Sequence, residues 1–112
     1  MLIGELSRLT GASARSLRYY EAQGLLEAAR GPNGYREYAE DALLAVHQIR
    51  ALLDAGLTTE VIRSVLPCVR GEQPEIEMCV DLRDVLGREL AATDARIADL
   101  RRNREALAGY LA

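Results

Sequence analysis

The feature that most limits how this chain can fold is a narrow apolar seam along its last third. Residues 81–112 contain no proline and predict one long helix. Apolar residues recur there at alternating spacings of four and three, with Arg104 as a charged exception, which is the a/d pattern of a coiled coil. One helix cannot bury such a stripe on itself, so a second copy of the chain is the expected partner. The predicted dimerisation residues are Leu86, Leu90, Thr93, Ile97, Leu100, Leu107 and Leu111.

The beginning of the chain predicts a different arrangement, with two short helices joined by a tight turn. Apolar residues at helical spacing indicate a first helix over about 3–9, which Gly11 interrupts. Ser13 is a typical N-cap for a second helix over 14–23, and Gly24 is typical of a helix end. Two short helices separated by a turn that contains glycine form a helix-turn-helix.

A hairpin is predicted directly after the second helix, at about 27–38. Asn33-Gly34 stands before a run of alternating aromatic and polar residues, which is a strong hairpin signal. A hairpin in this position of a helix-turn-helix is a wing. Apolar spacing then predicts two more helices, one over 40–55 and one that Thr58 caps and that Pro67 ends.

These elements predict a mainly α chain in three parts. A winged helix-turn-helix DNA-binding domain is expected over 1–67, a linker over 68–80, and a dimerisation helix over 81–112. The core has to be built from aliphatic side chains, because the five aromatic residues are all Tyr. Such a small domain gains stability when it buries a further face against a partner subunit.

The net charge of the chain does not decide whether it binds nucleic acid. Its net charge is −3, yet its 14 basic residues are all Arg. The guanidinium group matches phosphates and the guanine edge with two hydrogen bonds. Binding depends on the local potential of one face, and the acidic excess lies mostly after Arg50.

Composition also argues against several other classes of protein. No apolar run is long enough to cross a bilayer, and no signal peptide is recognisable, so we expect a cytoplasmic protein without a membrane partner. Two cysteines are too few for a disulfide scaffold. The single His47 and the two thiols form no nucleophile–base constellation with a third group, so we expect no enzymatic activity.

The second helix of a helix-turn-helix places its N-terminal residues at base edges or phosphates. Leu17 and Tyr20 fall on the core side of that helix, while polar residues fall on the outer side. A merely solvated polar face is the alternative interpretation. The adjoining wing disfavours that alternative, because a wing reaches the flanking DNA backbone. The predicted DNA-binding residues are Ser13, Arg15, Ser16, Arg18, Tyr19, Tyr35 and Arg36.

Five short stretches of this region form a specific pattern together. They are Ile3-Gly4-Glu5-Leu6, Thr10-Gly11, Leu17-Arg18-Tyr19-Tyr20-Glu21, Gly24-Leu25 and Asn33-Gly34-Tyr35-Arg36. This pattern closely resembles the MerR family of bacterial transcription regulators. The resemblance continues through the later helices and therefore covers nearly the whole chain.

The resemblance implies a homodimer held by an antiparallel coiled coil of the terminal helices. It also implies binding to a pseudo-palindromic operator in double-stranded promoter DNA with an over-long spacer. Bending and untwisting of that spacer would let RNA polymerase read both promoter elements. Tyr20 and Tyr38 would pack or make supporting phosphate contacts. The positions that match DNA-contacting positions of the family are Ser13, Arg15, Arg18, Tyr19, Tyr35 and Arg36.

The cysteines leave the question of an effector open. Metal-sensing relatives carry one cysteine at the start of the dimer helix, where Cys79 lies, and others beyond its end, where this chain has stopped. Cys68 and Cys79 could hold a thiophilic ion such as Cu(I) or Hg(II). A tetrahedral zinc site would need two more ligands, for which His47, Glu75 and Glu77 are candidates. Inert thiols and a redox pair are the alternatives. No cofactor is certain, and a metal- or thiol-responsive sensor is the alternative function.

Overall fold

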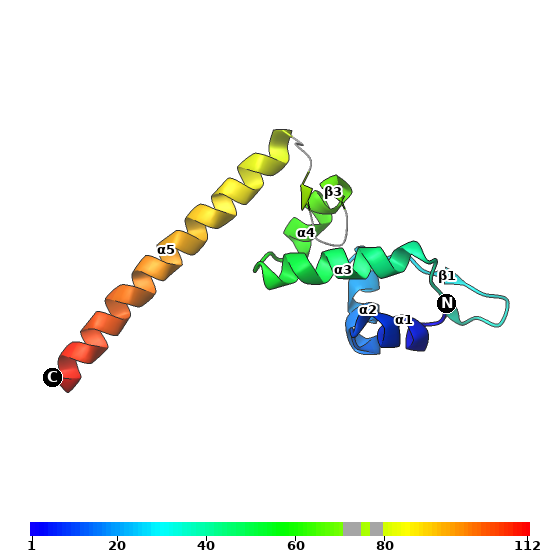
Figure 1. Cartoon of the computed structure of the whole chain (residues 1–112), viewed down its shortest axis with the longest axis horizontal. Coiled ribbons are helices and arrows are strands. Elements are labelled where there is room, and N and C mark those ends of the chain that lie inside the picture. The colour runs from blue at the N-terminus through cyan, green and yellow to red at the C-terminus, as the bar shows by residue number, and fades with distance from the viewer. Residues whose placement is uncertain (71–74, 77–79) are drawn as a thin grey trace. The chain divides into compact units, whose positions relative to one another are not determined.

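The computed structural model describes residues 1–70, 75–76 and 80–112, with side chains for 1–67 and 83–112. Its contacts divide the chain into two units, Met1–Glu77 and Met78–Ala112. The first unit, called the head, contains every helix and strand before the last helix (Figure 1). Helices dominate both units, so the predicted mainly α fold class is confirmed.

The helix-turn-helix begins the head. Helix α1 (Ile3–Thr10) ends at Gly11, whose φ of +77° favours a residue without a Cβ atom. Helix α2 (Ala14–Ala22) begins after Ser13, whose hydroxyl oxygen accepts a hydrogen bond from the Ser16 backbone N–H at 3.0 Å. The predicted cap is therefore present, and it fixes where α2 leaves the turn.

The predicted wing is a short antiparallel hairpin of β1 (Ala29–Arg30) and β2 (Arg36–Glu37). Its turn differs from the two-residue Asn-Gly type. The Gly34 N–H donates to the Gly31 carbonyl at 2.9 Å, and Gly34 has a φ of +82°, whereas Asn33 does not have a positive φ. The Asn-Gly pair thus marked the hairpin correctly, while the turn itself has Pro-Asn at its centre.

Two further helices follow the wing, as predicted. Helix α3 (Asp41–Asp54) is followed by Gly56, which has a φ of +87°. The Thr58 hydroxyl caps α4 (Thr59–Val65) by accepting a backbone N–H at 3.2 Å. A 3₁₀ turn, η1 (Leu66–Cys68), ends this part of the head.

The core of the head is aliphatic, as the composition predicts. The prediction of α3 rests on the spacing of Leu43, Leu44, His47 and Leu52. Of these, Leu52 is buried and Leu43 is half-buried, whereas Leu44 is 37% exposed and His47 is exposed. Ala42, Val46 and Ile49 turn inward instead. The largest fully buried side chains of the head are Leu6, Leu17, Val46, Ile49, Ile62 and Val65.

The segment predicted as a plain linker contains one pair of strands. Strands β3 (Val69–Arg70) and β4 (Glu75–Ile76) pair antiparallel, with Val69 opposite Ile76. The prediction missed this pair because strands of two residues are too short to show a hydrophobic period.

The second unit is built on α5 (Val80–Leu111), a continuous helix of 32 residues (Figure 1). It is about 48 Å long at 1.5 Å per residue. Leu86 at the start of its seam is half-buried, whereas the later seam leucines are exposed, for example Leu100 at 65% and Leu107 at 66%. Within the described part of the chain, no helix is both long and apolar enough to span a membrane.

Candidate nucleic-acid interface

The outer face of α2 is polar and accessible. Leu17 and Tyr20 are buried beneath it, while Arg15 and Arg18 are exposed and Tyr19 is 50% exposed. This is the division that helical spacing predicts. The structure therefore presents two guanidinium groups and one phenol on a helix whose other side is anchored in the core.

The first turn of α2 adds two hydroxyl groups to this face. Ser13 is exposed, accepts the Ser16 N–H and donates its own proton to the Ser16 Oγ at 3.0 Å. The Ser16 hydroxyl keeps its proton for an outside acceptor, since each hydroxyl is both donor and acceptor. The N-terminus of a helix carries a partial positive charge, which favours an anion such as a phosphate nearby.

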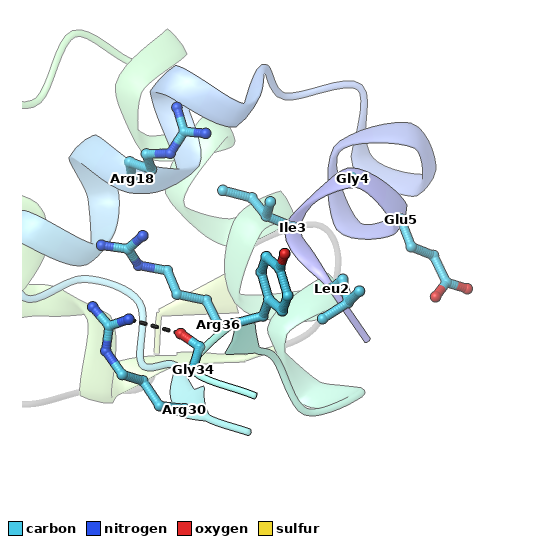
Figure 2. A pocket seen from close by; sticks show the side chains of 9 residues that line it. Leu2, Ile3, Gly4, Glu5, Arg18, Arg30, Gly34 and Arg36 are labelled. Atoms are coloured by element: carbon cyan, nitrogen blue, oxygen red, sulfur yellow. Dashed lines mark hydrogen bonds between the residues drawn. The ribbon is translucent and has the colours of Figure 1, made fainter. Parts of the chain in front are cut away.

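An open hollow of about 610 Å³ lies between α2, the start of α1 and the wing. Arg18 of α2, Arg30 of β1 and Arg36 of β2 line it, and Figure 2 shows their guanidinium groups along one side. Glu5 also lines the hollow, but its carboxylate points away from the arginines (Figure 2). Three guanidinium groups from three segments thus lie around one hollow in a chain of net charge −3.

The three arginines are held in different ways. The Arg30 Nη1 donates to the Gly34 carbonyl at 2.8 Å, which braces the wing turn (Figure 2). The Arg36 Nε lies 2.7 Å from Glu21 Oε2, so this ion pair ties the wing to α2. Arg18 makes no hydrogen bond or ion pair with any residue that the structure describes. Arg18 is therefore the arginine best placed to bind an external phosphate.

Tyr38 lies in the core at the base of the wing. It is 2% exposed, and its hydroxyl has no hydrogen-bond partner among the described residues. Burial, and then the negative charge of Glu21, raise the pKa of the Tyr38 phenol, so it stays neutral. Its backbone N–H donates to the Met1 carbonyl at 2.7 Å, which ties the start of the chain to the wing. Tyr20 and Tyr38 are thus packing residues in the single chain.

The structure gathers only part of the predicted set around the hollow. Arg18, Tyr35 and Arg36 line it, and Tyr35 is 64% exposed. Arg15 and Tyr19 lie on α2 outside that lining. Sequence reasoning missed Arg30, which stands opposite Arg36 in the hairpin. The strand register would have revealed it, because paired residues lie side by side on one face.

The predicted metal-binding thiols lie beyond what the structure describes. Cys79 falls in the undescribed segment 77–79, and Cys68 is described only in its backbone. His47 is exposed on α3. Among the described residues there is no group of three or more His, Cys, Asp or Glu side chains that could hold a metal ion.

Comparison with known proteins connects this geometry to a family. Residues 1–67 match the family described as MerR HTH family regulatory protein. The regulator HmrR of Rhizobium leguminosarum bv. viciae is 34% identical over 96% of this chain and 81% of its own length. The nodulation protein NolA of Bradyrhizobium elkanii is 35% identical over 86% of this chain, which spans only 40% of NolA.

A solved structure gives the same result for the fold. The transcription regulator PbrR691 from Ralstonia metallidurans CH34, crystallised in complex with lead(II), aligns with a TM-score of 0.80 and 29% identity. The alignment covers 96% of this chain and 82% of PbrR691. The chain therefore belongs to the MerR family of helix-turn-helix regulatory proteins and is a DNA-binding transcription regulator.

Proposed function

We propose that the chain acts as a homodimer on a pseudo-palindromic operator in double-stranded promoter DNA. Residues 1–67 form the DNA-binding part, 68–80 the linker and 81–112 the dimerisation helix. Each head places α2 in the major groove and its wing on the flanking backbone. Two heads related by a two-fold axis fit two half-sites of opposite direction. Distortion of the promoter spacer by this dimer then controls access by RNA polymerase.

One observation carries the proposal, namely the arrangement of Arg18, Arg30 and Arg36 around a single hollow. Phosphate contacts supply most of the affinity of such proteins, and arginine is suited to them in number and geometry. Arg15 and Tyr19 lie on the same helix and are accessible to base edges or phosphates.

The test is DNA binding by the variant Arg18→Ala. A gel shift or footprint on the DNA upstream of the chain's own gene, at one fixed salt concentration, should show binding weaker by about thirtyfold or more, since the dimer loses two contacts that each contribute roughly 1–3 kcal/mol. Arg88→Ala on α5 removes the same charge from an exposed position and is the matched control. Equal affinity of Arg18→Ala and the wild type would contradict the assigned face.

A second function, response to a thiophilic metal ion, is favoured by one specific observation. PbrR691, which shares 29% of its residues with this chain, was crystallised with lead(II). Cys79, with Cys68, would supply the thiolates. Titration with metal salts and native mass spectrometry is the test. If the wild type retains no metal and Cys79→Ser behaves identically, this function is excluded.

A further inference from the structure

A carboxylate lies where α2 meets the wing, on the side of the head that is proposed to bind DNA phosphates. Glu21 stands in the last turn of α2, and its Oε2 lies 2.7 Å from the Nε of Arg36 on β2. The Glu21 side chain remains 26% exposed. A negative charge at such a surface repels phosphates. Glu21 therefore favours DNA binding only if its effect on Arg36 outweighs that repulsion.

The wing is too small to fix its own position on the head. Its strands pair through two residues each, and an isolated two-stranded hairpin is only marginally stable in water. Arg30 and Arg36 also stand directly opposite each other, and like charges at such positions repel. Among the described residues, the Glu21–Arg36 contact is the one ion pair or hydrogen bond that joins the wing strands to α2. Glu21 thus offsets the repulsion and holds the wing against α2.

The contact with Glu21 occupies only the inner part of the Arg36 guanidinium. The Nε atom is buried, whereas the Arg36 side chain as a whole is 37% exposed and lines the hollow. The Nε–H forms no aligned hydrogen bond despite the 2.7 Å distance, so the contact is mainly an attraction between charges. The two terminal nitrogens of Arg36 donate no hydrogen bond to any described residue. They are left for an acceptor outside the chain.

The base of the wing brings Glu21 together with two cations. Burial, and then the Glu21 charge, raise the pKa of the Tyr38 phenol, while the charges of Arg36 and Arg18 lower it. All three charged groups therefore act on one hydroxyl. Arg18 and Arg36 also line the same hollow, so holding Arg36 in place keeps its terminal nitrogens on the surface that Arg18 shares.

We propose that Glu21 is a positioning residue for DNA binding. Its carboxylate holds the Arg36 guanidinium at Nε, so that the two terminal nitrogens face a DNA phosphate. Although its charge is negative, Glu21 strengthens DNA binding through Arg36. The inference rests on the DNA-binding face proposed above and adds to it a residue that does not itself contact DNA.

DNA binding by Glu21→Gln tests this inference, with duplex DNA from upstream of the chain's own gene as the probe. The substitution keeps the length of the side chain and removes its charge, on which the contact mainly depends. Loss of positioning should weaken binding about five- to tenfold, since the proposed dimer loses two ion pairs, whereas loss of repulsion alone would tighten it. The matched control is Glu5→Gln, because the Glu5 carboxylate lines the same hollow but points away from the arginines (Figure 2). It should bind as tightly as the wild type or slightly more tightly.

A double-mutant cycle shows whether Glu21 acts through Arg36. Arg36→Ala should weaken binding by about thirtyfold or more. In that background Glu21→Gln should leave the affinity unchanged or raise it, because no guanidinium remains to be positioned. Fluorescence anisotropy titrations at one fixed salt concentration measure all four affinities.

Salt dependence distinguishes positioning from a loss of stability. The slope of log affinity against log salt concentration should become less steep in Glu21→Gln, as in Arg36→Ala, because both lose a phosphate contact and the counterions that it releases. A variant that is only less stable would bind with the wild-type slope. Urea unfolding of each variant verifies that it is folded under the conditions of the titrations.

The outcomes separate the inference from the face on which it rests. If Arg18→Ala and Arg36→Ala both bind like the wild type, the face is wrong and the inference is lost with it. If Arg36→Ala binds weakly but Glu21→Gln binds as tightly as the wild type or more tightly, only the inference is overturned. Equal weakening by Glu21→Gln with and without Arg36, or an equal loss in Glu5→Gln, would also overturn it alone, since the effect would not pass through Arg36.

Discussion

The head and α5 use the same kind of side chain in opposite ways. Leu6 and Leu17 of the head are completely buried, whereas Leu100 and Leu107 of α5 are about two-thirds exposed. The head therefore gains its apolar stabilisation within one chain. A lone helix with an exposed seam gains it only on association, since most of the stability of a helix in a protein comes from packing of its apolar face. In the proposed homodimer, the stability of α5 should therefore depend on protein concentration, whereas that of the head should not.

The largest effect is expected from a substitution in the core of the head. Leu17→Ala should lower the free energy of unfolding of the head by about 2–5 kcal/mol, because it removes a fully buried side chain and leaves a cavity. Urea unfolding followed by circular dichroism measures this change, which should be equal at low and high protein concentration. Leu9→Ala, at a position that is 45% exposed, is the control and should cost much less. Equal costs at the two positions would contradict the assigned core.

The next largest effect is expected from a substitution in the apolar seam of α5. Leu100→Ala should weaken the proposed dimer by about 1.5–3 kcal/mol for each subunit, the transfer energy of one leucine side chain buried on association. The loss should appear as an increased dimer dissociation constant in sedimentation, while hydrogen exchange of core amides in the head stays unchanged. Leu100→Met preserves side-chain volume and is the control. A loss of head protection in Leu100→Ala would show that the two parts are not independent.

Local signals allowed much of both parts to be predicted from sequence. Ser13 and Thr58 cap the helices that they were predicted to cap, because a cap depends on a few neighbouring residues. The pairing of Arg36 with Glu21 was not predicted, since it depends on how the wing packs against α2. The position of Arg30 beside Arg36 was not predicted either, since it depends on the register of the two strands.

The faces of α3 show a second limit of the sequence. A helix with apolar residues on several sides offers more than one possible core face, and only packing decides among them. Leu44 belongs to the apolar pattern yet stays 37% exposed, while Ala42 is buried. On α5 the spacing predicts a single narrow seam, and that seam stays a prediction until a dimer is observed.

A smaller effect is expected from substituting a threonine in the head, compared with a threonine in α5. Thr58→Ala should destabilise the head by about 1 kcal/mol, because it removes the acceptor for a backbone N–H at the start of α4. Thr58→Ser keeps the oxygen and should preserve stability. Thr93→Ala in the interior of α5 should leave the unfolding of the head unchanged, since the partners of its hydroxyl among the described residues, Glu89 and Arg96, both lie on α5. Thermal unfolding of the three variants is the measurement, and a harmless Thr58→Ala would exclude the cap as a source of stability.

The smallest effect concerns the buried phenol at the base of the wing. Tyr38→Phe removes a hydroxyl that is buried without a hydrogen-bond partner among the described residues. Because such a group loses its water on folding without compensation, the variant should be as stable as the wild type or up to about 1 kcal/mol more stable. Tyr110→Phe on α5, at a position that is 89% exposed, should change nothing. A destabilised Tyr38→Phe would instead mean that the hydroxyl is hydrogen-bonded in solution, and the wing base would then be held by a polar contact as well as by packing.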